Sequence, residues 1–550
     1  MRYSSDIKVK KAEVMSHRER VIYYLLVSVG IFLTTIFGAW WFAFSHIPSN
    51  FQGIFHGIDI ILFISLSYVV WYQIINEIFS WAVANTMKHP VPLTPQKGQK
   101  VAFLTAFVPG SEPYEMLETT LKAMKAVNYS HDTWLLDEGN DAEAKRICKL
   151  YGVKHYTRKG SPYYNTSSGP YKVKSKGGNY NSWFHQHGNE YEFVAQIDID
   201  FIPKKDFLTK TLGYFRDPNV AFVGSPQVYG NTDESWIAKG AAEQAYGFYG
   251  SMQKGFFGSD MQLFIGANHV VRVKAHNSID GYAGHIVEDH LTGMKFYSHR
   301  WKSVYVPEIL AIGEGPASWD SYFSQQMRWA YGLIDILLTQ SPKLFGKMRM
   351  HHVANYFLLQ QYYFYGVAQI IGVVLLTLYF FFGIQATTMH LLPLILLYVP
   401  ILLWQQVLFF WLQRFNINPK EESGFMLNAK FLNWAAWPIY FLAFIGAITR
   451  KRLTYKVTPK GKEQNIHTNI SLFLPHFILG SFTFIDIIAS VYLHHLAIQL
   501  LFWAFLNTIV MYYFVFNEVL KKIMPMVHKQ FSNFILLFRF NRLSSNLLEI

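Results

Sequence analysis

The sequence contains little charge and almost no cysteine. Of its 550 residues only 15% are charged, whereas 51% are hydrophobic. Average soluble domains carry about 25% charged residues, so this composition excludes a disordered chain and a wholly soluble enzyme. The single cysteine, Cys148, excludes an intrachain disulfide framework and a metal site built from several thiolates.

The charge that is present is mostly positive. The formal net charge is +13 at pH 7, and basic residues gather in the loops beside long apolar runs. In a membrane protein this excess is expected in cytoplasmic loops. An anionic substrate such as a sugar nucleotide would also suit it, whereas nucleic acid is not expected as a partner.

Long uncharged runs lie at both ends of the chain. A helix of about 20 apolar residues crosses a bilayer core. We expect six crossings, at residues 21–44, 60–76, 354–384, 391–413, 473–493 and 496–516. Basic residues before the first run place the N-terminus in the cytoplasm. Both termini and the segment between the second and third crossings are then expected on the cytoplasmic side of the plasma membrane.

Two features of the apolar runs need a separate interpretation. The uncharged run 431–449 has basic residues on both flanks, and one crossing cannot keep both flanks in the cytoplasm. We therefore expect an interfacial or re-entrant helix, with Trp434 and Trp437 at the level of the headgroups. Asp486 lies inside the fifth expected crossing. It is either a buried hydrogen-bonded group or part of the lining of a channel.

The stretch from about 96 to 345 has the pattern of an α/β domain. Short apolar runs at 101–108, 134–136 and 193–197 predict strands, and residues 114–127 carry apolar side chains at helical spacing. Strands that alternate with helices predict a mostly parallel sheet with helices on both faces.

Three aspartates follow these predicted strands. Ligands of such sheets bind beyond the carboxyl ends of the strands, where Asp137, Asp198 and Asp200 are expected. Two carboxylates one residue apart lie on the same side of an extended chain. They suit a hard divalent cation that bridges to a diphosphate, although an ordinary solvated turn has the same pattern.

Three further motifs carry groups that could do chemistry. Lys176-Gly177-Gly178-Asn179 predicts a flexible loop that admits phosphate and neutralises it, or else a plain surface loop. Val287-Glu288-Asp289 offers a general base, or only an acidic first turn of a helix. Gln325-Gln326-Met327-Arg328-Trp329 precedes the next apolar run, where Arg and Trp also serve as interfacial anchors.

The order and spacing of these motifs resemble the processive, membrane-embedded family 2 glycosyltransferases of the cellulose synthase group. The set consists of Asp137-Glu138-Gly139, Lys176–Asn179, Asp198-Ile199-Asp200, Val287–Asp289 and Gln325–Trp329. Phe264-Ile265-Gly266-Ala267-Asn268 and the gating-loop sequence Tyr455-Lys456-Val457-Thr458-Pro459-Lys460 also match. The resemblance implies an α/β GT-A (Rossmann-like) cytosolic glycosyltransferase domain fused to an α-helical transmembrane bundle of about six spans with interfacial helices.

The resemblance implies a role for each matching residue. UDP and the donor sugar would be held by Asp137, Lys176, Asp198, Asp200 and Arg328, with Mg²⁺ or Mn²⁺ on Asp200 and Asp198. Asp289, beside Glu288, would be the base that deprotonates the acceptor. The acceptor and the channel entrance would involve Gln325, Trp329, Phe264 and Gly266. The gating loop would use Tyr455, Val457, Thr458 and Lys460. Val287 stands where the family usually has threonine.

The implied function is processive, inverting synthesis of a β-glucan from UDP-glucose and its secretion through the chain's own channel. The linkage is β-1,4, β-1,3 or mixed, and the implied partners are UDP-glucose, the growing polysaccharide, the lipid bilayer and accessory export subunits. Two alternatives stay open. One is a hyaluronan- or chitin-type synthase that uses UDP-N-acetylglucosamine, and the other is a polysaccharide transporter with a nucleotide-sensing domain.

These expectations divide the chain into six parts. They are the N-terminus with two spans (1–95), the GT-A domain (96–345), an interfacial segment with two spans (346–416), the interfacial helices and gating loop (417–471), the last two spans (472–520) and a cytosolic tail (521–550).

Overall fold

The computed structural model describes residues 7–451 and 469–520. The chain forms two compact units: Met1–Ile371 with Ala386–Gln464, and Gly372–Gln385 with Asn465–Ile550. Seven helices among the described residues are long and apolar enough to cross a membrane. The predicted gating-loop residues, Tyr455, Val457, Thr458 and Lys460, and the tail after 520 lie outside the described residues.

The first unit contains a seven-stranded sheet in the order β11-β8-β10-β6-β3-β4-β5. Every neighbouring pair is parallel except the two pairs made by β10, which runs antiparallel to β6 and β8. The predicted mostly parallel sheet is therefore confirmed. The strands are β3 (Val101–Phe107), β4 (Asp132–Asp137), β5 (Lys154–Tyr156), β6 (Phe193–Gln196), β8 (Val220–Gly224), β10 (His269–Arg272) and β11 (Lys302–Tyr305).

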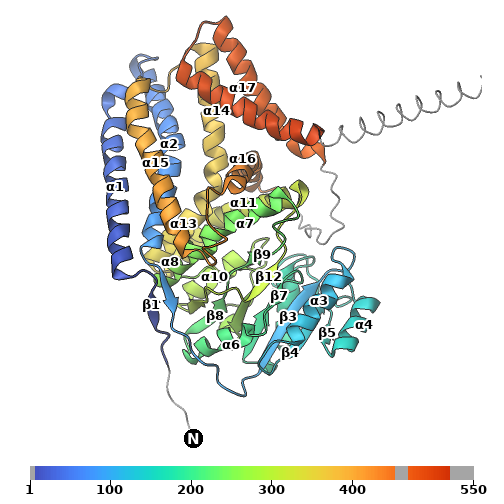
Figure 1. Ribbon diagram of the computed structural model, residues 1–550. Coiled ribbons are helices and arrows are strands. Elements are labelled where there is room, and N and C mark those ends of the chain that lie inside the picture. Colours follow the sequence, from blue (N-terminus) through green and yellow to red (C-terminus); the bar gives the residue numbers. More distant parts are fainter. Residues whose placement is uncertain (1–6, 452–468, 521–550) are drawn as a thin grey trace, which may run out of the picture. The chain divides into compact units, whose positions relative to one another are not determined.

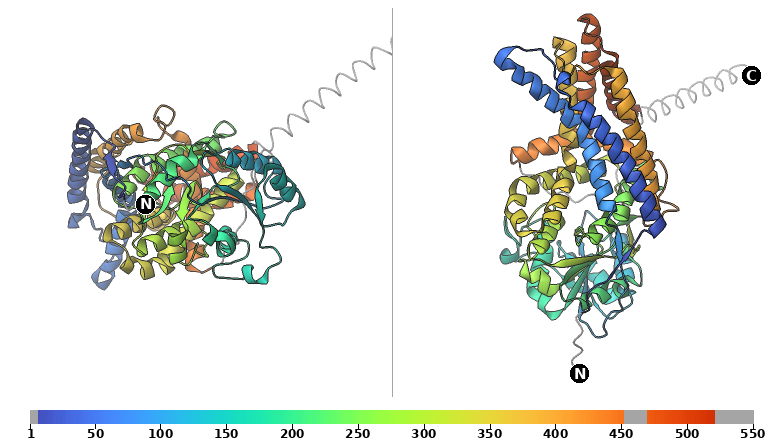
Figure 2. Two further views of the ribbon diagram at one scale, coloured as in Figure 1. Left: turned by 90° about the horizontal axis from the view of Figure 1, so that it is seen from below. Right: turned by 90° about the vertical axis from the view of Figure 1, so that its left-hand side faces the viewer.

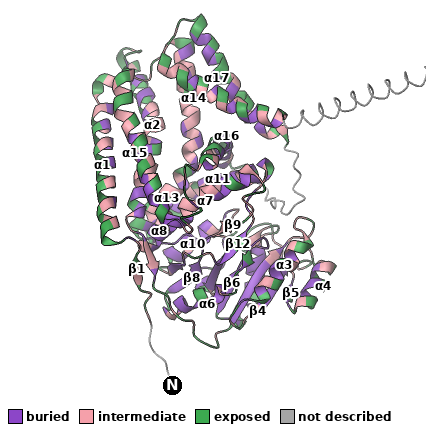
Figure 3. Ribbon diagram, viewed as in Figure 1, coloured by how far each residue is buried: buried purple, intermediate pink, exposed green. Residues whose placement is uncertain are grey.

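Helices cover both faces of this sheet, as the sequence predicted. Strand side chains alternate between two apolar cores, with Phe103 in one core and Leu104 in the other. The first core includes Leu117 of α3 and Ile147 of α4, and the second includes Trp183 of α5. Figure 3 shows the strands almost wholly buried. The helices of this region are α3 (Tyr114–Lys125), α4 (Ala142–Tyr151), α5 (Lys176–His187), α6 (Phe207–Thr211), α9 (Val273–Ser278) and α10 (Glu288–Ser298).

Two small sheets complete the strand set among the described residues. One has the order β7-β12-β9, with β7 (Ile202–Pro203), β9 (Val228–Tyr229) and β12 (Ala311–Gly313). The other pairs β1 (Lys11–Glu13) with β2 (Lys88–Pro90) in antiparallel register. The Lys11 ammonium forms an ion pair with Asp260. The N-terminal strand is thus fastened to the α/β domain.

A layer of helices packs on the α/β domain of this unit. It consists of α7 (Trp236–Gly247), α8 (Gln253–Gly258), α11 (Trp319–Thr339), α12 (Ser341–Leu344), α13 (Met350–Gln361) and α16 (Leu427–Ile448). The packing of α7 on α16 is close, because a Cβ at Gly240 would lie 2.6 Å from Cδ1 of Leu432. The Tyr440 hydroxyl of α16 donates a 2.9 Å hydrogen bond to Gln326 of α11.

Helix α16 corresponds to the run 431–449, which we expected at the interface. It meets the length and composition of a span, but half of its most apolar window is buried inside the chain, against 22% for α1. In Figure 1 α16 is seen nearly end-on, whereas α1, α2 and α15 are seen lengthwise. It therefore runs across them, as an interfacial helix would. The interfacial assignment stays a prediction, since the spans are defined by length and composition alone.

A bundle of apolar helices belongs to the same unit. It comprises α1 (His17–Trp41), α2 (His56–Ala84) and α15 (Leu391–Leu412), at the positions of three expected crossings. Phe37, Ile74 and Ile401, one from each helix, share a buried cluster. Figure 2 confirms from a second direction that α1 and α15 lie side by side. The outward face of α1 exposes Leu25 and Phe32, each 63% exposed, as expected of a helix in lipid.

The second unit is helical in its described part. It contains the end of α14 (Tyr365–Phe382), α17 (Leu474–Tyr492) and the helix Ile498–Leu520. Asp486 of α17 is fully buried and its Oδ2 accepts a 3.0 Å hydrogen bond from the Thr377 hydroxyl of α14. Of the two interpretations of Asp486, this contact favours the buried hydrogen-bonded group.

Candidate active site

The topology of the sheet brings the sequence motifs to one edge. Because β3, β4 and β6 are parallel, their carboxyl ends meet there, and Asp137 closes β4. Strand β10 runs the other way and starts at His269, which pairs with Gln196 at the end of β6. The Phe264–Asn268 loop, which precedes β10, therefore reaches the edge from which Asp198 and Asp200 continue.

Asp137 is buried, and hydrogen bonds within the chain hold its carboxylate. The backbone N–H groups of Gly139 and Asp141 donate to its two oxygens at 2.7 and 2.6 Å, and His155 Nε2 lies 2.9 Å from Oδ2. Burial alone would raise the pKa of Asp137, but these hydrogen bonds lower it. The carboxylate therefore shapes the turn after β4, as an aspartate followed closely by glycine commonly does.

Lys176 is the first residue of helix α5, not part of a flexible loop as expected. The Ser175 side chain accepts a 3.1 Å hydrogen bond from the Gly178 N–H and so caps this helix. Two glycines are poor helix formers, but both are buried here, and a Cβ at Gly178 would lie 2.3 Å from the Lys172 carbonyl oxygen. This close packing orients the lysine side chain.

The Lys176 ammonium links two of the motifs. It forms an ion pair with Asp198 and donates a hydrogen bond to the Gly266 carbonyl. Asp198, Ile199 and Asp200 do not continue strand β6 but enter a turn, in which the Phe201 N–H donates a 2.9 Å hydrogen bond to the Asp198 carbonyl oxygen. The prediction of an extended chain at these residues is therefore wrong, because the backbone turns directly after the two aspartates have left the strand.

Glu288 and Asp289 form the first turn of α10. Burial and the charge of Asp289 raise the pKa of Glu288. Burial also raises the pKa of Asp289, and its hydrogen bond from the His290 N–H and the charges of Lys176 and Arg328 act in the opposite sense. Both side chains are half-buried, and a partly desolvated carboxyl with a raised pKa is a suitable general base.

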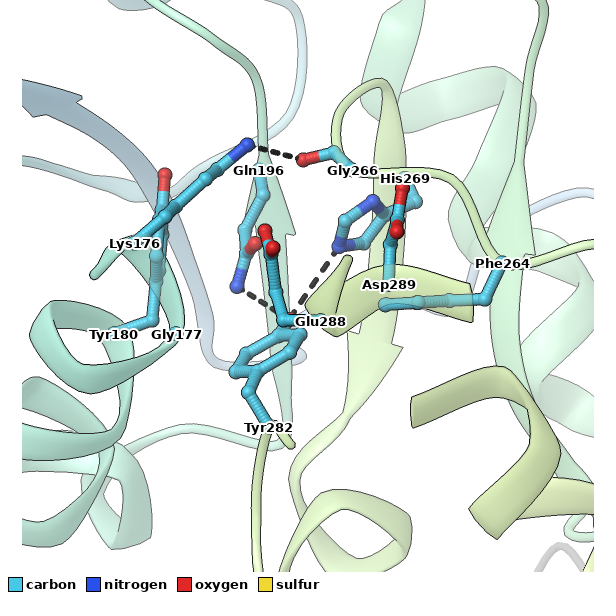
Figure 4. A pocket seen from close by; sticks show the side chains of 10 residues that line it. All are labelled: Lys176, Gly177, Tyr180, Gln196, Phe264, Gly266, His269, Tyr282, Glu288 and Asp289. Atoms are coloured by element: carbon cyan, nitrogen blue, oxygen red, sulfur yellow. Dashed lines mark hydrogen bonds between the residues drawn. The ribbon is translucent and has the colours of Figure 1, made fainter. Parts of the chain in front are cut away.

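Lys176, Gly266, Glu288 and Asp289 line one pocket, which is drawn in Figure 4. Lys176 and Gly266 lie on one side of it, and Glu288 and Asp289 rise from the start of α10. Its other lining residues are Gly177, Tyr180, Gln196, Phe264, His269 and Tyr282. A Cβ at Gly266 would lie 3.3 Å from Asp289 Oδ2 and 3.7 Å from Lys176 Nζ, so the glycine keeps this space open.

A buried polar network lines part of the pocket, and no local sequence pattern predicted it. Gln196 Nε2 donates a 2.6 Å hydrogen bond to the Tyr282 hydroxyl, and His269 Nε2 lies 3.4 Å from the same oxygen (Figure 4). Burial lowers the pKa of His269 to about 3, so the imidazole is neutral. The pocket therefore combines a charged rim with a neutral polar floor.

The predicted collar motif lies on α11. The charge of Arg328 lowers the pKa of both Glu288 and Asp289. Gln325 and Trp329 are half-buried on the same helix. Among the described residues that line the pocket of Figure 4, neither of these two is present. The role of Gln325 and Trp329 toward the acceptor stays a prediction.

Asp198 and Asp200 are the carboxylates expected to bind Mg²⁺ or Mn²⁺. No group of three or more His, Cys, Asp or Glu side chains in the described ranges is placed to hold a metal ion. A divalent cation that binds with a nucleotide needs only one or two protein carboxylates, since phosphate oxygens and water complete its shell. Asp198 and Asp200 supply that donor set, so the residues present fit such a cation.

Arg158, which the sequence analysis did not single out, holds the segment that leads to Lys176. It is 1% exposed and pairs with Glu138, the residue after Asp137. Its guanidinium also donates to four backbone carbonyls, those of Tyr164, Tyr171, Lys172 and Ser175. These bonds tie the segment 163–176 to the edge of the sheet.

Replacing Arg158 should therefore damage both the fold and the donor site. Arg158→Ala leaves Glu138 without its buried partner and should cost about 3–5 kcal/mol of stability. We expect a lower unfolding temperature and weaker UDP binding, measured in detergent by thermal scanning and calorimetry. Arg146→Ala removes an arginine of α4 whose side chain is 62% exposed, and it is the matched control. Unchanged UDP binding in Arg158→Ala would contradict the assigned role.

The pKa shifts give a prediction with a definite sign. The charge of Arg328 lowers the pKa of both carboxyls, so Arg328→Gln should raise them. A base must be deprotonated to act, so the acid limb of the kcat profile should move to higher pH, by about one unit. Arg146→Gln should leave the limb in place. A limb that stays or moves to lower pH in Arg328→Gln would separate these carboxyls from catalysis.

The fold and the site define the class of the protein. A GT-A-type α/β domain with aspartates at its strand ends is joined to helical segments, of which seven in residues 7–451 and 469–520 are long and apolar enough to cross a membrane. Residues 193–412 match the family described as "Glycosyl transferase family group 2". The resemblance to cellulose-synthase-like family 2 glycosyltransferases is thereby confirmed.

Individual relatives agree with this class. The chain is 26% identical over 52% of its length to the cellulose synthase catalytic subunit [UDP-forming] of Xanthomonas axonopodis pv. citri, and 25% identical over 64% to that of Pseudomonas fluorescens. It spans only 38% and 47% of these two relatives. A probable glucomannan 4-beta-mannosyltransferase of Arabidopsis thaliana is 24% identical over 55% of the chain and 60% of its own length.

One solved structure was also similar over much of the chain. The mannosyltransferase PcManGT from Pyrobaculum calidifontis, in complex with GDP-Man and Mn²⁺, aligns with 71% of this chain and 100% of its own. The sequence identity is 11% and the TM-score is 0.47.

Proposed function

We propose that this chain is a processive, inverting glycan synthase that extends a β-linked polysaccharide from a nucleotide sugar. One observation carries the proposal: a single pocket brings the half-buried Glu288–Asp289 pair together with the Lys176 ammonium at the carboxyl edge of the sheet. A base for the acceptor and a cation for the leaving diphosphate are the two groups that inverting sugar transfer needs.

The chemistry assigns a role to each side of the pocket. Asp289 takes the proton of the acceptor hydroxyl, whose oxygen then bonds to C1 of the donor sugar. The bond between C1 and the phosphate oxygen breaks, and UDP leaves with the electron pair. Lys176 and Arg328 stabilise the charge that develops on the diphosphate. A divalent cation on Asp200 and Asp198, when bound, would add Lewis-acid stabilisation to the same phosphates.

UDP-glucose is the proposed donor. The names of both bacterial relatives describe UDP-forming cellulose synthases, and their alignments cover half or more of this chain. The plant relative is named for mannose transfer, so a mannosyl nucleotide is the most informative alternative donor to compare with UDP-glucose. The proposed product is a β-glucan, and digestion with linkage-specific β-glucanases would identify its linkage.

The membrane helices suit a synthase that secretes its product. We propose a multi-pass plasma-membrane protein with the catalytic domain and both termini in the cytoplasm, where nucleotide sugars are made. Gln325 and Trp329 would guide the acceptor toward a channel between the helices, and Phe264 and Gly266 would line its entrance. Residues 455–460 would act as the gating loop, and accessory export subunits would take the polymer onward.

The proposal is tested with purified protein in proteoliposomes. Radiolabelled UDP-glucose, UDP-N-acetylglucosamine and GDP-mannose are supplied separately with Mg²⁺ or Mn²⁺. We expect a high-mass polymer from UDP-glucose that one linkage-specific β-glucanase degrades. Polymer from UDP-N-acetylglucosamine instead would move the substrate to the chitin or hyaluronan class. No polymer from any donor, with nucleotide binding intact, would contradict the synthase and favour the transporter.

A further inference from the structure

His285 connects the segment before the candidate base to helix α11. Its Nε2 lies 3.1 Å from Oδ2 of Asp335, and its Nδ1 accepts a 3.2 Å hydrogen bond from the backbone N–H of Val287. Because Nδ1 accepts, the ring hydrogen resides on Nε2, which donates to the carboxylate. The side chains of His285 and Asp335 are only 15% and 18% exposed. The imidazole thus fixes a local turn and bridges two elements at once.

The position of Val287 explains why this bond matters. Val287 is the N-cap of α10, and it makes no side-chain capping hydrogen bond. Helices usually begin with Ser, Thr, Asp or Asn, whose side chains stabilise the first turn. Glu288 and Asp289 occupy that first turn. The valine side chain has no hydrogen-bonding group, so His285, two residues upstream, stabilises the start of α10 instead.

One face of α11 packs against the turn that contains Val287. Arg328, Gly332 and Asp335 stand four and three residues apart, so they share that face. Arg328 acts on Glu288 and Asp289 through its charge. A Cβ at Gly332 would come within 2.0 Å of Cγ2 of Val287, so helix and turn are in close contact.

Asp335 is itself oriented from a second side. Nη1 of Arg450, just after the end of α16, lies 3.3 Å from its Oδ1, while Oδ2 faces His285. The carboxylate therefore cannot rotate without losing one of its two partners. Because the imidazole of His285 bonds both to Asp335 and to the Val287 N–H, the position of Asp335 on α11 constrains the turn at Val287.

We propose that His285 is a positioning residue that sets the Asp289 carboxylate in the pocket by fastening the start of α10 to α11 through Asp335. This inference rests on the proposed function, because it takes Asp289 as the base. The contacts of His285 are with the turn and with α11, so the effect should fall on the chemical step. A displaced base costs rate steeply, since a shift of about 1 Å can reduce rate about 10²-fold.

Four variants separate the two bonds of His285. In His285→Asn the amide oxygen can still accept from the Val287 N–H, as in an Asx turn, but it is too short to reach Asp335. His285→Ala loses both bonds. Asp335→Asn keeps an oxygen that accepts from Nε2–H, whereas Asp335→Ala keeps none. His299→Asn, at an exposed histidine after α10, is the matched control.

We expect a kcat effect that follows the cross-link to α11. At saturating donor, His285→Asn and Asp335→Ala should each lower kcat about tenfold, and His285→Ala about a hundredfold. Asp335→Asn should restore kcat to near the wild-type value. The KM for the donor and the UDP affinity should stay within about twofold in all of them, which also verifies folding. Combining His285→Asn with Asp335→Ala should cost no more than either alone.

The outcomes distinguish this inference from the proposed function. Wild-type kcat in both His285→Asn and Asp335→Ala, with activity abolished in Asp289→Asn, would overturn the positioning role and leave the synthase intact. A rise in KM at constant kcat would overturn it as well, because the network would then serve donor binding. Full activity in Asp289→Asn would overturn the proposed function itself.

Discussion

Asp289→Asn should abolish polymer formation while the protein still folds and binds UDP. The amide has nearly the same shape as the carboxylate but cannot take the proton of the acceptor hydroxyl. General-base catalysis contributes about 10²–10⁴-fold, so kcat should fall by at least that range. Asp289 is half-buried and desolvation raises its pKa, so replacing it by a neutral amide also removes a partly desolvated charge and should not destabilise the domain.

The control for this variant is Asp233→Asn, which changes an exposed aspartate outside the pocket. Its rate should equal that of the wild type. UDP binding by calorimetry and the unfolding temperature verify that both variants are intact. Polymer synthesis by Asp289→Asn at more than a tenth of the wild-type rate would remove Asp289 from the role of base.

Asp200→Asn should be nearly as damaging, for a different reason. Asp200 is 8% exposed at the edge of the sheet and is the principal carboxylate proposed for the divalent cation. An amide oxygen carries no charge and is a weaker ligand for a hard cation. Metal stabilisation of a leaving diphosphate is worth several kcal/mol, so we expect at least a 10²-fold loss.

The distinguishing measurement for Asp200 is the metal dependence of nucleotide binding. In the wild type, Mn²⁺ should strengthen UDP binding, and a chelator should reverse the gain. In Asp200→Asn the gain should disappear while binding without metal is unchanged. Asp198→Asn should lose less, because Lys176 already occupies one oxygen of Asp198. A full Mn²⁺ effect in Asp200→Asn would exclude it as the ligand.

The part of the fold that the sequence predicted is the part with local signals. Strands β3, β4 and β6 are short apolar runs that stop at Pro109-Gly110 or at aspartates, and a buried parallel strand needs no more. The antiparallel strand β10 was missed, because His269–Arg272 is short and its direction depends on pairing with β6 and β8. Such pairing is a tertiary property.

The site shows the same division. Asp137, Asp198 and Asp200 could be placed at strand ends because direction along the chain fixes which end they follow. Lys176 was expected in a loop because two glycines disfavour helix, and only the packing against Arg158 and Lys172 makes the helical turn stable. The pair of His285 with Asp335 joins residues 50 positions apart, and no local pattern announces it.

The most direct test of the central claim is a pulse-chase of elongation by the reconstituted protein. A short pulse of labelled UDP-glucose is followed by an excess of unlabelled donor, and the mass of labelled product is followed with time. The account predicts that pulse label moves into ever longer chains whose number stays constant, and that Asp289→Asn makes none. Labelled products that remain short, or an Asp289→Asn variant that elongates chains like the wild type, would contradict it.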